Sequence, residues 1–362
     1  GLFTQVEQLN KTALKAHGLD KSGHLYKVNS FDFHRYEDTI KLADDPDYNQ
    51  ANFDGMLEIK GDTDHTKLIE MLDALNDESQ KIDDVLDIYF DTENLVYWLA
   101  FQILTGNCDT QNRNCYLYSP LNSKVWYILD WDNDGMLRKL ELSLTGFSDY
   151  ASWERGASNY WGNVLFNRAL RSKSFRSELD RAVKDLRSYL TETRLTKMIK
   201  HYREVTESLV FASPDIDHLP VTKDQYEQIT AAIPSEIEEN YKSFRESYKK
   251  PMPFYIGVPQ IDNGKLRINW DASYDFEARD IRYTVELARD YAIKDVLFKA
   301  DDVLLPEVTC DAPDTGQYFV RVRATNSDGF TQDAFDYYAT DDGKHYGMKC
   351  FYVQDGGKVV ED

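Results

Sequence analysis

An acid and an amide five residues apart form a pair that could do chemistry. Asp109 is followed by Asn114, and a second acid, Asp132, lies beyond two short apolar segments. Phosphoryl transfer requires a carboxylate that receives the proton of the attacking hydroxyl, and oxygen ligands that hold a divalent metal against the nucleotide phosphates. Carboxylate and amide oxygens suit Mg²⁺, a small cation that prefers oxygen. The spacing and order of these three residues therefore predict a metal–phosphate site.

The segments around this pair would bring the three side chains together. Residues 95–104 are apolar on nearly every side, which is typical of a buried central helix. Asp91 or Thr92 could cap this helix and Gly106 could end it. The strands expected next, joined by a turn sequence, cover residues 115–118 and 125–129. Helix, loop, hairpin and acidic turn thus follow one another in the order that such a site requires.

The same acidic segment also fits the loop of a calcium-binding EF-hand. The residues that match the EF-hand pattern are Asp130, Asp132, Asp134, Gly135 and Glu141. An EF-hand loop needs an incoming helix, whereas residues 125–129 are few, β-branched and aromatic. A calcium-only structural loop and a metal-free acidic turn stay as alternatives to the phosphoryl-transfer site.

The overall composition limits the other functions. The chain has 362 residues, 42% of them hydrophobic, and a formal net charge of -21. This length exceeds what one hydrophobic core usually serves, so we expect two domains. A surface this acidic repels the phosphates of nucleic acids and of anionic membranes, which makes both poor partners. No apolar run approaches the roughly 18 residues of a membrane span.

The cysteines are too few for a disulfide scaffold and include no zinc-type pair. Two of the four, Cys108 and Cys115, bracket the segment that carries Asp109 and Asn114. Either a disulfide or two buried thiols could occur there.

Local patterns predict most of the remaining helical part of the chain. Asn10 is a suitable N-cap for a short helix. His24, His34 and His65 lie in polar segments without ligand spacing, so we expect most of them at the surface. The expected elements are strands over 1–9 and 24–28, and helices over 10–17, 64–76, 157–211 and 222–248.

The composition changes at residues 249–253, after which apolar and polar residues alternate. About seven short strands fit between 254 and 362, which favours an all-β sandwich of the immunoglobulin type. This region resembles the fibronectin type III fold. Under that resemblance Trp270 would be the core tryptophan, and Tyr318 could occupy the tyrosine-corner position.

The first 250 residues resemble the CotH family, the atypical protein kinases associated with spore coats. The resemblance lies in residues 1–8, 23–27 and above all 109–134. In the last stretch the family pattern is Asp-x4-Asn, a Tyr-Leu-Tyr strand and then Trp-Asp-x-Asp. The chain has Asp109, Asn114 with Cys-Tyr-Leu-Tyr after it, and Trp131 with Asp-Asn-Asp after it.

This resemblance implies an ATP-dependent protein serine/threonine kinase that uses Mg²⁺ or Mn²⁺. Asp109 would be the catalytic Asp, Asn114 and Asp132 the metal ligands, and Asp134 an accessory acid. Glu7 would lie in a hinge strand beside the adenine. The family's phosphate-binding lysine would lie upstream of Gly1, because the chain starts without Met and in what we interpret as the middle of a strand. We therefore expect a fragment or processed product.

Taken together, the sequence predicts an α+β chain in two domains. A mostly helical kinase-like lobe with a small hairpin would cover residues 1–250, and the β-sandwich would cover residues 254–362. The expected substrate is a protein, such as a coat or cell-surface protein, and the expected location is extracellular or on the spore coat. One alternative is a catalytically degenerate scaffold whose sandwich contacts polysaccharide. Another is a module stabilised by Ca²⁺.

Overall fold

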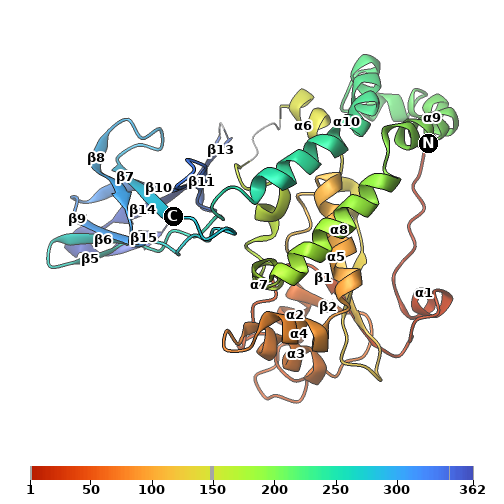
Figure 1. Ribbon diagram of the computed structural model, residues 1–362, viewed down its shortest axis with the longest axis horizontal. Helices are drawn as coiled ribbons and strands as arrows, with labels where there is room; N and C mark the ends of the chain where they lie inside the picture. The colour runs from red at the N-terminus through yellow and green to blue at the C-terminus, as the bar shows by residue number, and fades with distance from the viewer. Residues whose placement is uncertain (1, 147–150, 342, 362) are drawn as a thin grey trace. The chain divides into compact units, whose positions relative to one another are not determined.

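The computed structural model describes residues 2–146, 151–341 and 343–361. These residues divide into two compact units, which are considered separately. One comprises residues 1–148 and 162–242, and the other comprises residues 149–161 and 243–362. Figure 1 shows a helical part with a small sheet and a separate part made of strands. The predicted α+β class is confirmed.

The first unit contains a four-stranded antiparallel sheet in the order β2-β1-β3-β4. Its strands are β1 (His24–Val28), β2 (Leu57–Ile59), β3 (Cys115–Ser119) and β4 (Tyr127–Asp130). The strand expected over 24–28 is confirmed, and so is the predicted hairpin, within two residues at its ends. The register sets Cys115 opposite Asp130, so the hairpin opens directly before Cys115 and directly after Asp130.

Ten helices surround or extend from this sheet in the described part of the chain. The helical region predicted over 157–211 contains three α-helices, the first of which begins at Val164, because Ser172 and Thr191 each cap a new start with a side-chain oxygen. The helices are α1 (Lys11–Ala16), α2 (Gln50–Met56), α3 (Thr66–Asn76), α4 (Ile82–Tyr89), α5 (Thr92–Thr105), α6 (Lys139–Leu144), α7 (Val164–Arg171), α8 (Lys173–Tyr189), α9 (Glu192–Val210) and α10 (Lys223–Ser247).

Helix α5 is the buried central helix that the sequence predicts. The Asp91 carboxylate accepts from the backbone N–H of Asn94 at its start, and Gly106 ends the helix with a φ of 63°. A side chain at Gly106 would also collide with Asn240, because an added Cβ would lie 2.6 Å from its Nδ2. The chain therefore leaves α5 in one fixed direction, toward Asp109.

Two expectations for the start of the chain are wrong. Residues 2–9 form no strand and are largely exposed, while the helix capped by Asn10 is present as α1. His24 and His65 are buried, and His34 alone of the three is exposed. The ring of His65 stacks on Phe53, with the ring centroids 4.2 Å apart. The polar neighbours in sequence concealed this packing, because the partner ring comes from a distant helix.

The second unit is an antiparallel β region. Leu266 and Ile268 of one sheet share a single buried cluster with Val285 and Val320 of another, so the two sheets enclose one core. Its sheets are β5-β6-β9, β15-β14-β10-β7-β8 with β11 beside β10, and the hairpin β12-β13. The strands are β5 (Gln260–Asp262), β6 (Lys265–Asn269), β7 (Ile281–Ala288), β8 (Val296–Val303), β9 (Glu307–Asp311), β10 (Gly316–Asn326), β11 (Thr331–Asp333), β12 (Tyr337–Thr340), β13 (Gly343–Tyr346), β14 (Met348–Val353) and β15 (Val359–Glu361).

Candidate functional site

The acid and the amide singled out in the sequence are in contact. Nδ2 of Asn114 donates to Oδ2 of Asp109 at 2.8 Å and to the Asp109 backbone carbonyl at 3.1 Å. Asn114 adopts a left-handed backbone with a φ of 58°, a conformation that Asn tolerates better than most residues. Because the amide nitrogen faces Asp109, the amide oxygen of Asn114 remains available to another ligand.

The hairpin brings Asp132 to the same end of the sheet. Asn114 directly precedes Cys115 in β3, and Asp132 follows two residues after Asp130, which is opposite Cys115 in β4. Asp132 is also left-handed, with a φ of 54°, so the chain turns sharply there. The register therefore places Asn114 and Asp132 at the open end of one hairpin.

A close backbone approach holds the acidic turn against Asp109. An added Cβ at Gly135 would lie 2.7 Å from Oδ1 of Asn107 and 3.3 Å from Cβ of Asp109. Only glycine fits there without displacing a neighbour. The turn that carries Asp132 and Asp134 thus packs directly on the loop that carries Asp109.

A network of polar side chains that the sequence did not predict joins α5 to the acidic turn and holds the turn in place. Nε2 of Gln102 in α5 donates to Asp130 at 2.9 Å and to Asn133 at 3.2 Å, and Nδ2 of Asn107 donates to Oε1 of Gln102 at 3.0 Å. The side chains of Gln102 and Asn107 are buried. The sequence offered one sign of this network: Gln102 lies in the apolar segment of a helix expected to be buried. A buried polar group needs a hydrogen-bond partner, so its presence indicates a polar contact.

The Asp130 carboxylate belongs to this network. Asp130 as a whole residue is exposed, but its carboxylate is turned toward α5 and away from water. Burial raises the pKa of Asp130, and hydrogen bonds from Asn133 and Gln102 offset part of that rise. Asp130 therefore has a structural role in holding the turn, as distinct from the exposed Asp132 and Asp134.

The donor set available to a metal consists of hard oxygens. Asp132 and Asp134 are exposed, and the amide oxygen of Asn114 is free to face them. Among the described residues no group of three His, Cys, Asp or Glu side chains is arranged to hold a metal ion. A site with one or two carboxylates suits Mg²⁺, which keeps several waters and takes further ligands from substrate phosphates. The residues therefore fit a cation that is shared with a nucleotide.

The EF-hand alternative lacks its incoming helix. Strand β4 leads into the acidic turn where an EF-hand would have a helix. Glu141, the residue that would complete the calcium loop, instead accepts from the guanidinium of Arg138 at 2.8 and 3.0 Å.

Glu7 lies apart from any strand. Its carboxylate contacts Nε2 of His17 at 2.8 Å, and both side chains are more than half exposed. The cysteines that bracket the site, Cys108 and Cys115, form no disulfide in this structure; Cys115 is buried and Cys108 is half-buried.

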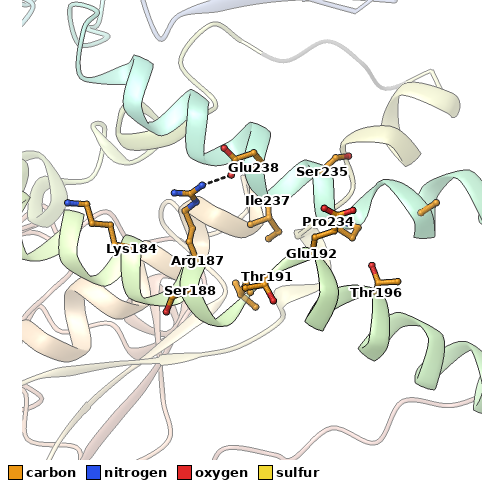
Figure 2. A pocket seen from close by; sticks show the side chains of 12 residues that line it. Lys184, Arg187, Ser188, Thr191, Glu192, Thr196, Pro234, Ser235, Ile237 and Glu238 are labelled. Atoms are coloured by element: carbon orange, nitrogen blue, oxygen red, sulfur yellow. Dashed lines mark hydrogen bonds and ion pairs between the residues drawn. The ribbon is translucent and has the colours of Figure 1, made fainter.

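A large pocket lies elsewhere in the first unit. It has a volume of about 710 Å³ and is lined by residues of α8, of the start of α9 and of α10. Figure 2 shows Arg187 paired with Glu238 on one side and Pro234 on the other. None of the residues that line it belongs to the candidate site, and its cations and carboxylates are balanced.

The fold and the site define a class of protein: a mostly helical unit whose small hairpin and preceding loop bring acidic side chains and an amide to one end of a sheet. The family model described as CotH kinase protein matches residues 1–244, and the chain belongs to this family. Membership of a kinase family implies the use of ATP and of a substrate that accepts the phosphoryl group.

No curated protein matches the sequence. The solved structures include a match to the twitchin kinase region from C. elegans, at 16% identity and a TM-score of 0.20. That match covers 26% of this chain and 20% of the twitchin chain. Every helix in the described part of the chain is too short or too polar to cross a membrane.

Proposed function

We propose that the protein transfers a phosphoryl group from ATP to serine or threonine hydroxyls of a protein substrate, with Mg²⁺ or Mn²⁺ as cofactor. The observation that carries this proposal is the contact between Asp109 and Asn114 at the hairpin end that also bears Asp132. Family membership supports the same activity.

Asp109 is the catalytic base in this proposal. Its Oδ2 is held by Asn114, while more than half of its side chain is exposed. Arg113 approaches Oδ1 only to 3.9 Å, so one face of the carboxylate stays open to an incoming hydroxyl. Asp109 would accept the proton of that hydroxyl as the phosphoryl group is transferred.

Asn114 and Asp132 are the proposed metal ligands, and Asp134 is an accessory acid beside them. A divalent cation, when bound, would neutralise negative charge on the nucleotide phosphates. The protein's share is to fix the two oxygen ligands, which it does through the left-handed backbone at both residues. Glu7 is proposed on the adenine side from the family resemblance, because residues 2–9 form no hinge strand. A change to Gln is expected to raise KM for ATP more than it lowers kcat.

The second unit is a fibronectin type III-like sandwich in this proposal. Trp270 is buried in the core between the two sheets. The hydroxyl of Tyr318 donates to the backbone carbonyl of Asp314 at 2.9 Å, as in a tyrosine corner. We propose that this unit, residues 254–362, contacts a surface polysaccharide or protein, and that the protein works outside the cell or on a spore coat.

The test is ATP-dependent labelling of the protein itself and of a serine- and threonine-rich protein acceptor, with Mg²⁺ or Mn²⁺. Asp109→Asn and Asp132→Ala are each expected to lower the rate by about 10²- to 10⁴-fold. Asp87→Asn, a change of an exposed carboxylate on α4, is the matched control and should leave the rate unchanged.

Two outcomes would count against the proposal. Full activity of Asp132→Ala would show that Asp132 is not a metal ligand, and the proposed metal site would then be wrong. A wild-type protein that binds no ATP with Mg²⁺ in calorimetry would favour the degenerate scaffold.

A further inference from the structure

Helix α9 (Glu192–Val210) is poorly covered by its own unit. Leu195 is its only fully buried residue. Helix α9 has 19 residues, and most helices in proteins are stabilised mainly by the tertiary packing of an apolar face. Figure 1 shows α9 at the margin of the helical part of the molecule. We therefore expect the exposed face of α9 to pack against another protein surface.

That face carries a stripe of large apolar side chains. Met198, Tyr202, Val205 and Leu209 are exposed to 39%, 61%, 61% and 46%. Their spacings of four, three and four residues are those of successive core positions in a two-stranded coiled coil. We call these four residues the α9 stripe.

The α9 stripe points away from α10. Arg203 donates to Glu227 of α10 at 2.6 Å and to Glu207 of its own helix at 3.1 Å, which identifies the face of α9 that is turned to α10. At 3.6 residues per turn the centre of the stripe lies about 130° around the helix from Arg203. The stripe and the contacts with α10 therefore use different faces.

The spacing within the stripe is symmetric about its centre. Met198 and Leu209 are equally far from the midpoint, and so are Tyr202 and Val205. Two copies of α9 laid antiparallel would set Met198 against the partner's Leu209 and Tyr202 against the partner's Val205. In a two-fold interface each residue i that contacts residue j of the partner is matched by a residue j that contacts residue i of the partner, and this spacing meets that requirement.

The charges of α9 favour the same arrangement. Its first half carries Arg194, Lys197 and Lys200 against Glu192, while its second half carries Glu204 and Glu207 against Arg203. An antiparallel pair brings unlike halves together, and a parallel pair would bring like halves together. Helix α9 also has four Lys and Arg against three Glu, in a chain whose formal net charge is -21. It is thus a surface on which two such acidic molecules can approach each other.

We propose that the protein forms a two-fold symmetric dimer through antiparallel pairing of the α9 stripes of two copies. The inference is independent of the kinase activity proposed above. Each helix is about 28 Å long, so the interface is small and the dimer should dissociate in the micromolar range.

Sedimentation velocity over a series of protein concentrations tests the dimer. The wild-type protein is expected to shift from monomer to dimer as its concentration rises, and Val205→Glu is expected to stay monomeric. Leu304→Glu changes an apolar residue of similar exposure, 62%, outside α9 and should dimerise as the wild type does. Unchanged circular dichroism of both variants shows that the fold is intact. A wild type that stays monomeric, or a Val205→Glu variant that still dimerises, overturns the proposal.

The register is tested by mixing two variants. Tyr202→Lys and Val205→Glu should each be monomeric alone and should form a heterodimer together, because antiparallel pairing sets the new lysine against the partner's new glutamate. In a parallel pair the two changes would not meet. A mixture that stays monomeric contradicts the antiparallel register.

Discussion

The candidate site and the core of the second unit are built on opposite principles. At the site, position is set by hydrogen bonds among Gln102, Asn107 and Asp130 and by left-handed backbone at Asn114 and Asp132. Apolar packing adds the contact of Trp131 with Tyr116, whose ring centroids lie 5.4 Å apart. The function of the site therefore depends on the exact positions of a few polar atoms. We expect a small change in these positions to affect activity more than the free energy of folding.

In the second unit, position is set by apolar side chains that alternate along strands. Leu266 and Ile268 face the shared core, while Lys265, Arg267 and Asn269 between them are exposed. The burial of these apolar side chains stabilises the fold, and such a core tolerates small shifts in side-chain position. The difference predicts that changes in the sandwich core cost stability, whereas changes at the site cost activity.

The largest stability loss is expected for Trp270→Ala. Trp270 is 4% exposed and contacts the Tyr283 ring at a centroid distance of 5.2 Å. Its removal should lower the free energy of unfolding by about 3 to 5 kcal/mol, measured by urea denaturation. Leu305→Ala, at a residue 67% exposed, is the control and should change it by less than about 0.5 kcal/mol. Equal losses for both would show that the core is not where stability resides.

At the site, Gly135→Ala should lower activity far more than stability. The new methyl group would force Asn107 or Asp109 to move, and a displacement of about 1 Å near reacting groups can cost about 10²-fold in rate. The stability loss should stay near about 1 kcal/mol. Gly55→Ala adds a methyl group that meets nothing within 4 Å and serves as the control. The comparison fails if Gly135→Ala transfers phosphate normally.

The same difference explains what the sequence could and could not reveal. A continuous apolar run predicted α5, and apolar alternation predicted the strands, because burial leaves a trace in the sequence. The described part of the second unit has eleven strands where about seven were expected, since short edge strands such as β11 and β15 are too brief to show a period.

The site residues Asp109, Asn114 and Asp132 were predictable from their spacing, but the network beneath them was not. Gln102 and Asn133 are joined by hydrogen bonds between segments 31 residues apart, and such contacts leave no local pattern. The strand predicted over 1–9 was wrong for a related reason. No described strand pairs with residues 2–9, and Glu7 contacts His17 instead.

Buried polar groups in the first unit should also make its stability depend on pH. His65 contacts the hydroxyls of Tyr26 at 3.0 Å and Tyr48 at 3.3 Å, and burial lowers its pKa below the ordinary value of 6.5. Below pH 6.5 the unfolded chain therefore takes up the proton more readily than the folded chain. Stability should fall as the pH drops below about 6.5, by up to about 1.4 kcal/mol per pH unit.

Urea denaturation at pH 7.5, 6.5 and 5.5 measures this dependence. His65→Gln keeps hydrogen-bonding capacity without the charge, so its stability should be lower at pH 7.5 but should fall less steeply toward pH 5.5. His24, whose pKa burial also lowers, should account for part of the slope that remains. A slope unchanged by His65→Gln would assign the pH dependence elsewhere.

The smallest effect is expected where the sandwich itself relies on one hydrogen bond. Tyr318→Phe removes the bond to the Asp314 carbonyl but keeps the ring, which is 3% exposed and packs on Phe351. The free energy of unfolding should fall by about 1 kcal/mol, because one hydrogen bond is lost and the packing is retained. Tyr337→Phe, at a residue 49% exposed, should change it by only a few tenths. If Tyr318→Phe costs as much as Trp270→Ala, the second unit depends on directed polar contacts as the site does, and the contrast between the two regions does not hold.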